Sequence, residues 1–453
     1  TAVAILKLAE EGKIDLNDDI TKYIKDYPTN GHSITIKHLL NHTSGIKSYT
    51  GMEKWDAEER KRDFSPTELI DYFKNEPMDF APGEQFKYNN SGYVLLGHII
   101  ELVSGESYAD YVQNHLFKPL NLDNSFYGST SKVIKNRASG YDKVDDAYIN
   151  SDFLSMTQPY AAGSLLSTVD DVYTWYMAIM NDELISKASR EMAHQMGVLK
   201  NGDKIDYGFG WFIGNIQNSP MIEHGGGING YLTASVFLPE ENVFVAVFSN
   251  CNCNAPSATA NKIAALAIGK PFSWDKVEMN AEALSSYQGV YEKSADDVRI
   301  FTFEDGQLYS LRTGGVRYKI HPFAKDQFFF EDGVVTLHFN RNAKGELASV
   351  TLKSTGQDQQ WIKTDKPIPT FTVIELDEKV FKTYIGKYEL APNFHINVFS
   401  KDGKMFVVAT GQEEVELLAI GKNQLMLKDT DIKITMNSSE VGVVESLTLH
   451  QNG

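Results

Sequence analysis

The stretch FAPGEQFKYNNSGYVLLGHIIELVSGESY, residues 80–108, decides the fold of this chain. Its apolar segment Ser91–Val103 has the composition of a buried helix, and Gly105 supplies a typical C-terminal cap. Tyr88 lies on the loop directly before this helix. A tyrosine there can present its hydroxyl group to a cleft, and it carries protons when nearby positive charge lowers its pKa. The structural alternative is that Asn90 or Ser91 simply caps the helix.

Residues 1 to about 270, on both sides of this stretch, mix helical and strand signals. Ser65-Pro66-Thr67-Glu68 combines an N-cap serine, a proline at the first helical position and an acidic residue at the third. YLTASVFLPEENVFVAVFSN, residues 231–250, predicts two buried strands joined by a turn. We therefore expect an α+β region in which helices cover an antiparallel sheet.

The pattern changes near Pro271, after which short strands and turn signals replace helical periodicity. YQGVYE at Tyr287 recurs as YIGKYE at Tyr384, and the Asp-Gly turn at Asp305 recurs at Asp402 with the same offset of 97 residues. This repeat predicts two small antiparallel barrel modules. The expected domains are therefore 1–272, 273–368 and 369–453.

The composition excludes several classes of function. The 60 acidic and 43 basic residues give a formal net charge of −17, which repels nucleic acid and anionic membranes. No apolar run is long enough for a membrane span. His38 and His42 are four residues apart, but no glutamate follows at the place a zinc helix needs, so we expect no metal and no organic cofactor.

The only two cysteines, Cys251 and Cys253, are two residues apart. Residues at this spacing rarely reach good disulfide geometry, and two thiolates do not complete a zinc site. We interpret both cysteines as structural.

A second candidate site is His224-Gly225-Gly226-Gly227, which lies at or before the start of a predicted strand. Glycines there let a ligand approach the backbone, and a backbone N–H can face an oxyanion. The alternative is a flexible glycine loop beside a core histidine.

In chain order, the elements ITIKHLLNHTSGI, the 80–108 stretch, AAGSLLSTVDD, YGFGW and HGGG resemble the serine β-lactamase and penicillin-binding-protein superfamily. They are most similar to its class C branch and the related DD-peptidases, esterases and D-aminopeptidases. The resemblance covers residues 1 to about 270, and the C-terminal repeats resemble lipocalin-like modules of some D-aminopeptidase relatives. In relatives such modules can border the cleft, although a pure packing role is the alternative.

The resemblance implies roles for individual residues. Tyr88 would relay the proton of the nucleophile, and Asn90 would orient the substrate. His224, Gly225 and Gly226 would form the third motif, and the N–H of Gly227 would supply half of the oxyanion hole. A histidine in the third motif is more similar to peptidases and esterases than to β-lactamases.

The first family motif, S-x-x-K, has no match in this sequence with the expected helical context. Its three matches begin at Ser44, Ser129 and Ser273, and none opens a helix that continues as an apolar face. In the family this motif opens the helix whose continuation is similar to the stretch that starts at Thr1. We therefore expect the nucleophile before Thr1, the chain as given to be inactive alone, and a sheet without its N-terminal strands or apolar surface exposed beside Thr1.

The resemblance implies a serine hydrolase that forms an acyl-serine with amides or esters, such as short or D-amino-acid peptides. A true β-lactamase and a non-catalytic pseudoenzyme that binds peptide or cell-wall fragments remain as alternatives. Family habit implies export to the periplasm or surface, and the oligomeric state is not legible in the sequence.

Overall fold

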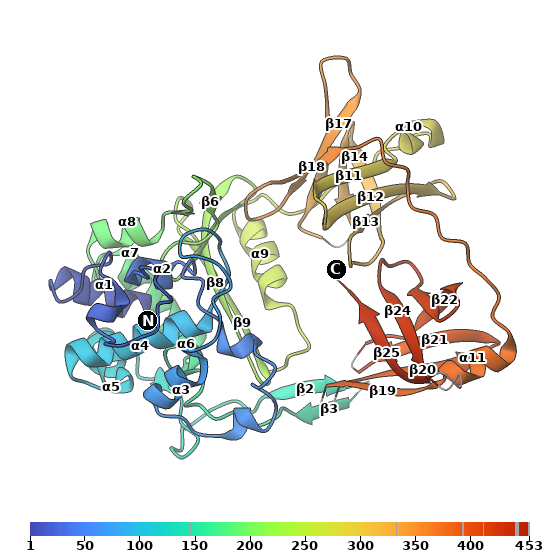
Figure 1. Cartoon of the computed structure of the whole chain (residues 1–453). Helices are drawn as coiled ribbons and strands as arrows, with labels where there is room; N and C mark the ends of the chain where they lie inside the picture. Colours follow the sequence, from blue (N-terminus) through green and yellow to red (C-terminus); the bar gives the residue numbers. More distant parts are fainter. Residues whose placement is uncertain (145–146, 332, 392–393, 411, 440–443, 452–453) are drawn as a thin grey trace. The chain divides into compact units, whose positions relative to one another are not determined.

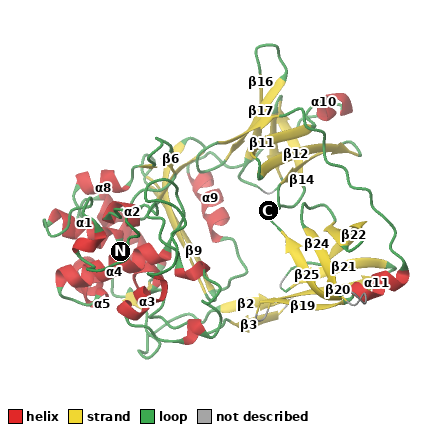
Figure 2. Ribbon diagram, viewed as in Figure 1, coloured by secondary structure: helices red, strands yellow, loops and turns green. Residues whose placement is uncertain are grey.

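The computed structural model describes residues 1–453 except 145–146, 332, 392–393, 411, 440–443 and 452–453. The chain forms two compact units, Thr1–Lys143 with Tyr148–Pro271 and Val144–Ala147 with Phe272–Gly453. Helices are concentrated in the first unit and strands in the second (Figures 1 and 2). The change of character expected near Pro271 coincides with the boundary between the units, whereas the three-domain division stays a prediction.

The helices of the first unit are α1 (Ala2–Glu10), α2 (Ile36–Leu40), α3 (Pro66–Phe73), α4 (Asn90–Ser104), α5 (Tyr108–Val112), α6 (Tyr160–Gly163), α7 (Val169–Met180), α8 (Lys187–Ala193) and α9 (Pro256–Ala267). Of these, α1, α2, α3, α5 and α6 contact α4, and α7 and α9 pack against the main sheet. Short strand pairs join β1 (Phe126–Tyr127) to β4 (Leu165–Leu166), β2 (Tyr141–Val144) to β3 (Ala147–Asn150), and β5 (Gly197–Val198) to β6 (Lys204–Ile205).

Helix α4 is the helix that the opening stretch predicts. Asn89, rather than Asn90 or Ser91, is its N-cap, and its side chain accepts a hydrogen bond from the backbone N–H of Gly92. Gly105 ends the helix with φ of 76°, the left-handed conformation that glycine adopts without cost. Val94, Leu95, Leu96, Ile99 and Ile100 are fully buried, and burying each such side chain stabilises the fold by about 1.5–3 kcal/mol.

The main sheet of the first unit is antiparallel and has the strand order β10-β9-β8-β7. Its strands are β7 (Phe212–Ile216), β8 (Ser219–Ile228), β9 (Tyr231–Leu238) and β10 (Val243–Ser249). The two strands predicted within residues 231–250 are thus confirmed as β9 and β10. The predicted helix-covered antiparallel sheet is confirmed.

The second unit begins with a closed eight-stranded barrel in which each strand pairs with the next and β18 returns to β11. Its strands are β11 (Gly289–Ser294), β12 (Asp297–Glu304), β13 (Gln307–Arg312), β14 (Tyr318–Ala324), β15 (Gln327–Phe330), β16 (Thr336–Arg341), β17 (Leu347–Lys353) and β18 (Gln359–Lys363).

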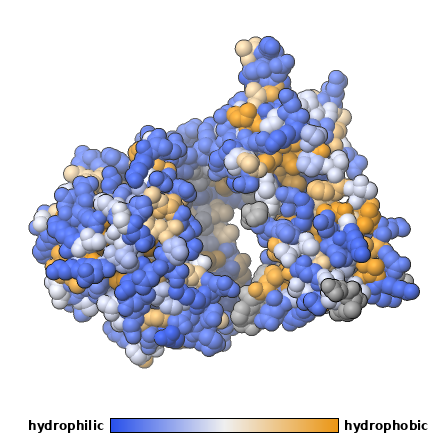
Figure 3. Space-filling model, in the orientation of Figure 1, coloured by the Kyte–Doolittle hydropathy of each residue, from blue (hydrophilic) through white to orange (hydrophobic). Residues whose placement is uncertain are grey.

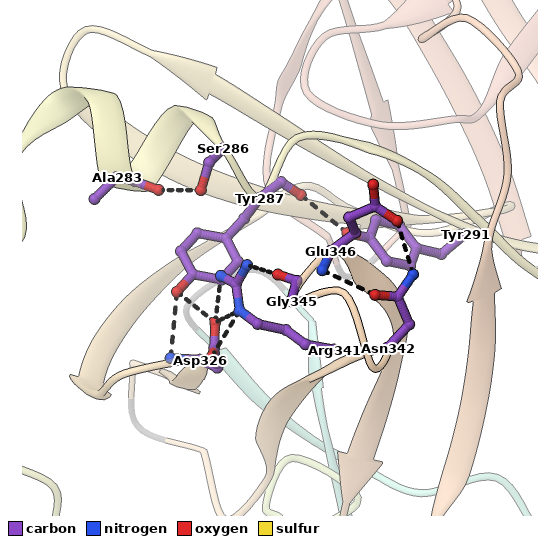
Figure 4. A network of polar contacts seen from close by, with 9 residues as sticks. All are labelled: Ala283, Ser286, Tyr287, Tyr291, Asp326, Arg341, Asn342, Gly345 and Glu346. Atoms are coloured by element: carbon purple, nitrogen blue, oxygen red, sulfur yellow. Dashed lines mark hydrogen bonds and ion pairs between the residues drawn. The ribbon is translucent and has the colours of Figure 1, made fainter.

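Helix α10 (Ala281–Ser285) leads into this barrel, and a polar network joins the strands at that end (Figure 4). The hydroxyl of Tyr287 donates to the Asp326 carboxylate at 2.8 Å, and Arg341 donates to the same carboxylate at 2.8–3.1 Å. The Tyr291 hydroxyl donates to the backbone oxygen of Tyr287 at 3.3 Å. These bonds hold the segment after α10 against the strand ends.

A second antiparallel sheet follows α11 (Glu378–Tyr384). It contains β19 (Gly386–Ala391), β20 (Phe394–Lys401), β21 (Lys404–Ala409), β22 (Val415–Gly421), β23 (Gln424–Leu427), β24 (Lys433–Ser438) and β25 (Val444–His450) in sequential order. One closed and one seven-stranded barrel-like sheet confirm the expected pair of all-β modules.

The two cysteines keep the structural role expected of them, but they are joined by a bond that their spacing disfavours. Cys251 and Cys253 form a disulfide, although residues two apart rarely reach the required geometry. They lie directly after β10 in a loop that Tyr141 holds, because the backbone N–H of Asn252 donates to the Tyr141 oxygen at 3.0 Å and the N–H of Tyr141 donates to the Asn250 oxygen at 3.0 Å.

Most of the surface seen in Figure 3 is hydrophilic, in keeping with the many charged residues. Among the described residues, no helix has both the length and the apolar character that crossing a bilayer requires.

Candidate functional site

Tyr88 lies on the loop before α4, and its side chain is 41% exposed. Its ring stacks on Phe212 with an interplanar angle of 10° and lies 4.1 Å from the His42 ring, centroid to centroid. The His224 ring is 6.0 Å away. The structure therefore brings together Tyr88 and His224, two candidates that are far apart in the sequence.

Desolvation raises the pKa of Tyr88. A tyrosine carries protons only when a nearby positive charge lowers its pKa, and in the described part of the chain no lysine or arginine pairs with the Tyr88 hydroxyl. The expected activating cation is therefore not among the residues seen around Tyr88. The S-x-x-K lysine of the resemblance is the group that would fill this role.

The buried His42 ring packs against the Tyr88 ring. It is only 1% exposed, and its ring centroid lies 4.9 Å from that of Tyr93 and 4.7 Å from that of Tyr207. Its Nδ1 accepts a hydrogen bond from the backbone N–H of Asn89 at 3.0 Å. Burial lowers the pKa of His42 to about 3, with a smaller contribution from His224, so the imidazole stays neutral.

The sequence pair His38 and His42 has two separate structural tasks. His38 belongs to the capping box of α2, where its Nδ1 accepts from the Thr35 N–H at 3.2 Å. Within the described ranges, no group of three or more His, Cys, Asp or Glu side chains is arranged to hold a metal ion.

His224 is fixed in one tautomer by two partners. Its Nδ1 lies 2.7 Å from the backbone oxygen of Gly225, and a carbonyl oxygen only accepts, so Nδ1 carries the proton. Its Nε2 lies 3.0 Å from the Tyr207 hydroxyl, which must then donate. Burial lowers the pKa of His224, which keeps the ring neutral. Both nitrogens are engaged, so this histidine positions its surroundings rather than accepting a proton.

Tyr207 is the site residue that the sequence analysis missed. It lies in YGFGW, a stretch quoted for the resemblance without any role for the tyrosine. Its ring is 1% exposed and contacts His42, Phe212 and His224. The usable signal was that Tyr207 begins a stretch in which aromatic residues alternate with Gly208 and Gly210, and a Cβ atom at Gly208 would lie 2.0 Å from the backbone oxygen of Ala193.

The three glycines precede β9, as expected, and they also belong to a strand themselves, because they lie inside β8. Gly225, Gly226 and Gly227 pair with β9 and are exposed. The ladder with β7 ends at Glu223, opposite Phe212. Beyond that pair no described strand pairs with this edge of β8, and an edge without a strand partner is the geometry that an oxyanion hole or an extended substrate needs.

A side chain at Gly225 would clash with the backbone of the neighbouring strand β9. A Cβ atom at Gly225 would lie 2.8 Å from the backbone oxygen of Thr233, and at Gly226 it would lie 2.8 Å from the Thr233 Oγ1. At Gly227 the nearest atom would be the Leu232 Cδ2, at 3.4 Å. The close strand approach thus requires glycine most strongly at Gly225.

Asn90 is the first residue of α4 and points elsewhere. Its side-chain amide donates to the Thr50 Oγ1 at 3.0 Å, and its backbone N–H donates to the Ser48 Oγ at 3.3 Å. No described contact joins Asn90 to Tyr88 or His224. Its role in orienting the substrate therefore stays a prediction.

The start of α1 packs beside this site. A Cβ atom at Gly210 would lie 2.8 Å from the Ala2 Cβ and 3.5 Å from the Tyr93 hydroxyl. The Thr1 hydroxyl donates to the backbone oxygen of Ala161, in α6. The first turn of α1 thus lies beside Gly210, in the stretch that also contains Tyr207.

The three S-x-x-K matches do not reach this place in an active arrangement. Ser44 is buried in a loop, where its Oγ accepts from the Ile46 N–H, and Lys47 pairs with Asp79 at 3.0 Å. Ser129 lies in an exposed loop, and Ser273 belongs to the second unit. None of them opens a helix, as the sequence analysis concluded.

The part of the chain that matches a known protein family coincides with the first unit. The family model described as Beta-lactamase matches residues 1–270. Penicillin-binding protein 4* of Bacillus subtilis is 30% identical over 393 residues, which cover 80% of this chain and 85% of that protein.

Two solved structures are similar in fold. A D-stereospecific amidohydrolase from Streptomyces sp. superposes with a TM-score of 0.53 at 27% identity, covering 59% of this chain and 83% of that chain. An octameric penicillin-binding protein homologue from Pyrococcus abyssi gives 0.54 at 23% identity, covering 92% of this chain and 85% of that chain. The second likeness extends the fold comparison over nearly the whole chain.

Proposed function

Since the chain belongs to the beta-lactamase family of penicillin-binding-protein-like serine hydrolases, we propose that it hydrolyses amides or esters of short or D-amino-acid peptides through an acyl-serine. The observation that carries the proposal is the convergence of three elements on one site. Tyr88 before α4 and His224 on β8 contact the aromatic residues around His42, and Ala2 at the start of α1 lies beside Gly210, three residues after Tyr207.

The nucleophile in this proposal is the serine of an S-x-x-K pair at the start of a helix. Serine and lysine one turn apart share a helix face, so the lysine can activate the serine and hold the pKa of Tyr88 down. Tyr88 would then pass the proton of the serine to the leaving group. Burial alone raises the pKa of Tyr88, so the lysine is what the proposed proton transfer depends on.

The glycine edge of β8 would bind the reacting carbonyl group. The N–H of Gly227 would supply one oxyanion donor, and the open edge would pair with an extended substrate. His224 would keep this edge in place through its bond to the Gly225 oxygen and its link to Tyr207. A neutral histidine at this position carries no charge to attract the carboxylate of a β-lactam, which favours amides and esters without a carboxylate next to the reacting bond.

The D-amino-acid preference rests on the similarity to the D-stereospecific amidohydrolase. The test is hydrolysis of D-alanyl p-nitroanilide, its L-enantiomer and nitrocefin by the protein produced from its natural gene. We expect the D-anilide to be hydrolysed fastest, and Tyr88→Phe to lower its kcat/KM by roughly 10²–10⁴-fold.

Nitrocefin as the best substrate would instead indicate a β-lactamase. No turnover of any substrate, with the same ligand affinity in wild type and Tyr88→Phe, would indicate a binding protein and refute the proposal.

A further inference from the structure

The two β modules provide an internal comparison, because they match position by position. In the first module Arg299 of β12 is opposite Tyr291 and Arg312, and 97 residues later Ile396 is opposite Tyr388 and Ala409. The hydrogen bond that joins the segment after α10 to the strand ends recurs as well. The Tyr384 hydroxyl donates to the Asn423 side chain, as the Tyr287 hydroxyl donates to Asp326. The modules therefore share one register.

At the barrel end away from α10, the inward side chains of the first module are charged or polar, whereas those at the equivalent positions of the second module are apolar. Three inward positions of the first module are Arg299, Ser310 and Arg312, and their counterparts in the second module are Ile396, Val407 and Ala409. The second module fills this region with apolar side chains, and Ile396 and Val407 are buried. The fold itself therefore does not require the charges of the first module.

Arg299 is a buried cation without a carboxylate of its own. It is 6% exposed, its Nη1 donates to the Ser310 Oγ at 2.9 Å, and its guanidinium lies 4.7 Å from the centre of the Trp361 ring. Its Nε has no hydrogen-bond partner among the described residues. Burial, and to a smaller extent the charge of Arg312, lowers the pKa of Arg299 to about 10, and the charge of Asp297 opposes both effects.

The nearest carboxylate is already engaged by other groups. Asp297 accepts two hydrogen bonds from Arg312, at 2.8 and 2.9 Å, and one from the Trp361 indole at 3.0 Å. An unpaired buried charge is costly, so a protein retains one where something else compensates it. The aromatic stacking on Trp361 offsets only part of that cost.

Two further cations surround the same indole. Lys293 lies 5.8 Å and Arg312 lies 5.5 Å from the centre of the Trp361 ring. Three positive charges thus face one carboxylate, in a chain whose net charge is −17. The Arg312 side chain is 47% exposed, so the group extends from the interior of the barrel to solvent.

We propose that this cluster, formed by Lys293, Asp297, Arg299, Arg312 and Trp361, binds a small oxyanion such as a carboxylate at the end of the β11–β18 barrel away from α10. The free Nε–H of Arg299 donates to the anion. Arg312 and Lys293 supply the surrounding positive charge, and Asp297 competes with the anion for Arg312. This site is independent of the hydrolase function proposed for the first unit.

The test uses the full chain with 15N-labelled tryptophan. The sequence has five tryptophans, and a Trp361→Phe variant identifies the indole N–H signal of Trp361. Sodium acetate and sodium phosphate are titrated against sodium chloride at equal ionic strength. We expect a saturable shift of the Trp361 signal with an oxyanion and none with chloride, and the acetate and phosphate arms distinguish a carboxylate from a phosphate ligand.

Two substitutions give opposite expectations. Arg299→Met should weaken oxyanion binding by about tenfold or more, because a charge-assisted hydrogen bond is lost. Asp297→Asn should strengthen it, because the competing carboxylate is gone while an acceptor for the indole remains. Lys319→Met removes an exposed cation from β14 of the same module and should leave binding unchanged.

A Trp361 signal that responds equally to chloride and to both oxyanions would overturn the proposal, and so would unchanged binding in Arg299→Met. If Arg299→Met does not fold, the Asp297→Asn variant tests the proposal instead. Unchanged or weaker oxyanion binding in that variant would contradict the competition between Asp297 and the anion, and would overturn the proposal.

Discussion

Lowering the pH from about 7 to about 4.5 should destabilise the first unit, because His42 is buried as a neutral imidazole. Its pKa is about 3 in the folded protein, against an ordinary value of 6.5. The unfolded chain therefore binds a proton first as the pH falls. The stability that His42 contributes is complete above pH 6.5 and is lost progressively towards pH 3. At pH 4.5 the loss amounts to about 2–3 kcal/mol of unfolding free energy.

The assay compares wild type with His42→Gln, whose side-chain oxygen can still accept from the Asn89 N–H. Hydrogen exchange of α4 peptides in a urea series, read by mass spectrometry at both pH values, reports the unfolding free energy of the first unit. His42→Gln should be less stable than wild type near pH 7, yet should lose about 2–3 kcal/mol less between the two pH values. His32→Gln, which removes an exposed histidine, should follow wild type.

Equal losses in wild type and His42→Gln would refute this reasoning. They would show that the imidazole is charged in the folded state or that solvent reaches it. His42 would then not be buried as a neutral ring against Tyr88.

Two further predictions concern the β8 edge. Gly225→Ala should destabilise the first unit by about 1–3 kcal/mol, because its Cβ would meet a backbone oxygen of β9 that cannot move aside. Gly227→Ala should stay within about 0.5 kcal/mol of wild type, and equal thermal shifts for the two would contradict the close approach at Gly225. Tyr207→Phe should leave the Nε2 of His224 without a donor, so 15N chemical shifts should change from one tautomer towards a mixture. Unchanged His224 shifts would show that the hydroxyl does not fix the ring.

Local signals carried most of the fold prediction. The apolar run before Gly105, the capping box at Ser65 and the two strands after Tyr231 each have a strong local cause in capping or burial. The 97-residue repeat identified the two modules because duplicated strands keep the same turn residues. The N-cap of α4 was misplaced by one residue or more, since Asn89, Asn90 and Ser91 are all good caps and only the backbone geometry selects among them.

The candidate site was harder to predict because its contacts are distant in sequence. Tyr88 and His224 came from motifs, but nothing local indicates that His42 lies beneath Tyr88 or that Tyr207 bonds His224. The bond between the cysteines was not predicted, because their spacing in the sequence does not show the loop that brings their sulfur atoms together. The unpaired charge of Arg299 was likewise invisible, because a strand pattern does not reveal which inward side chain lacks a partner.

Trapping the acyl-enzyme tests the central claim most directly. The protein produced from its natural gene is incubated with a fluorophosphonate, and the modified residue is located by mass spectrometry. The account predicts one labelled serine with a lysine three positions later, distinct from Ser44, Ser129 and Ser273, and loss of labelling when that serine is replaced by alanine. Labelling of any of those three serines, or label on no serine while the D-anilide is hydrolysed, would contradict it.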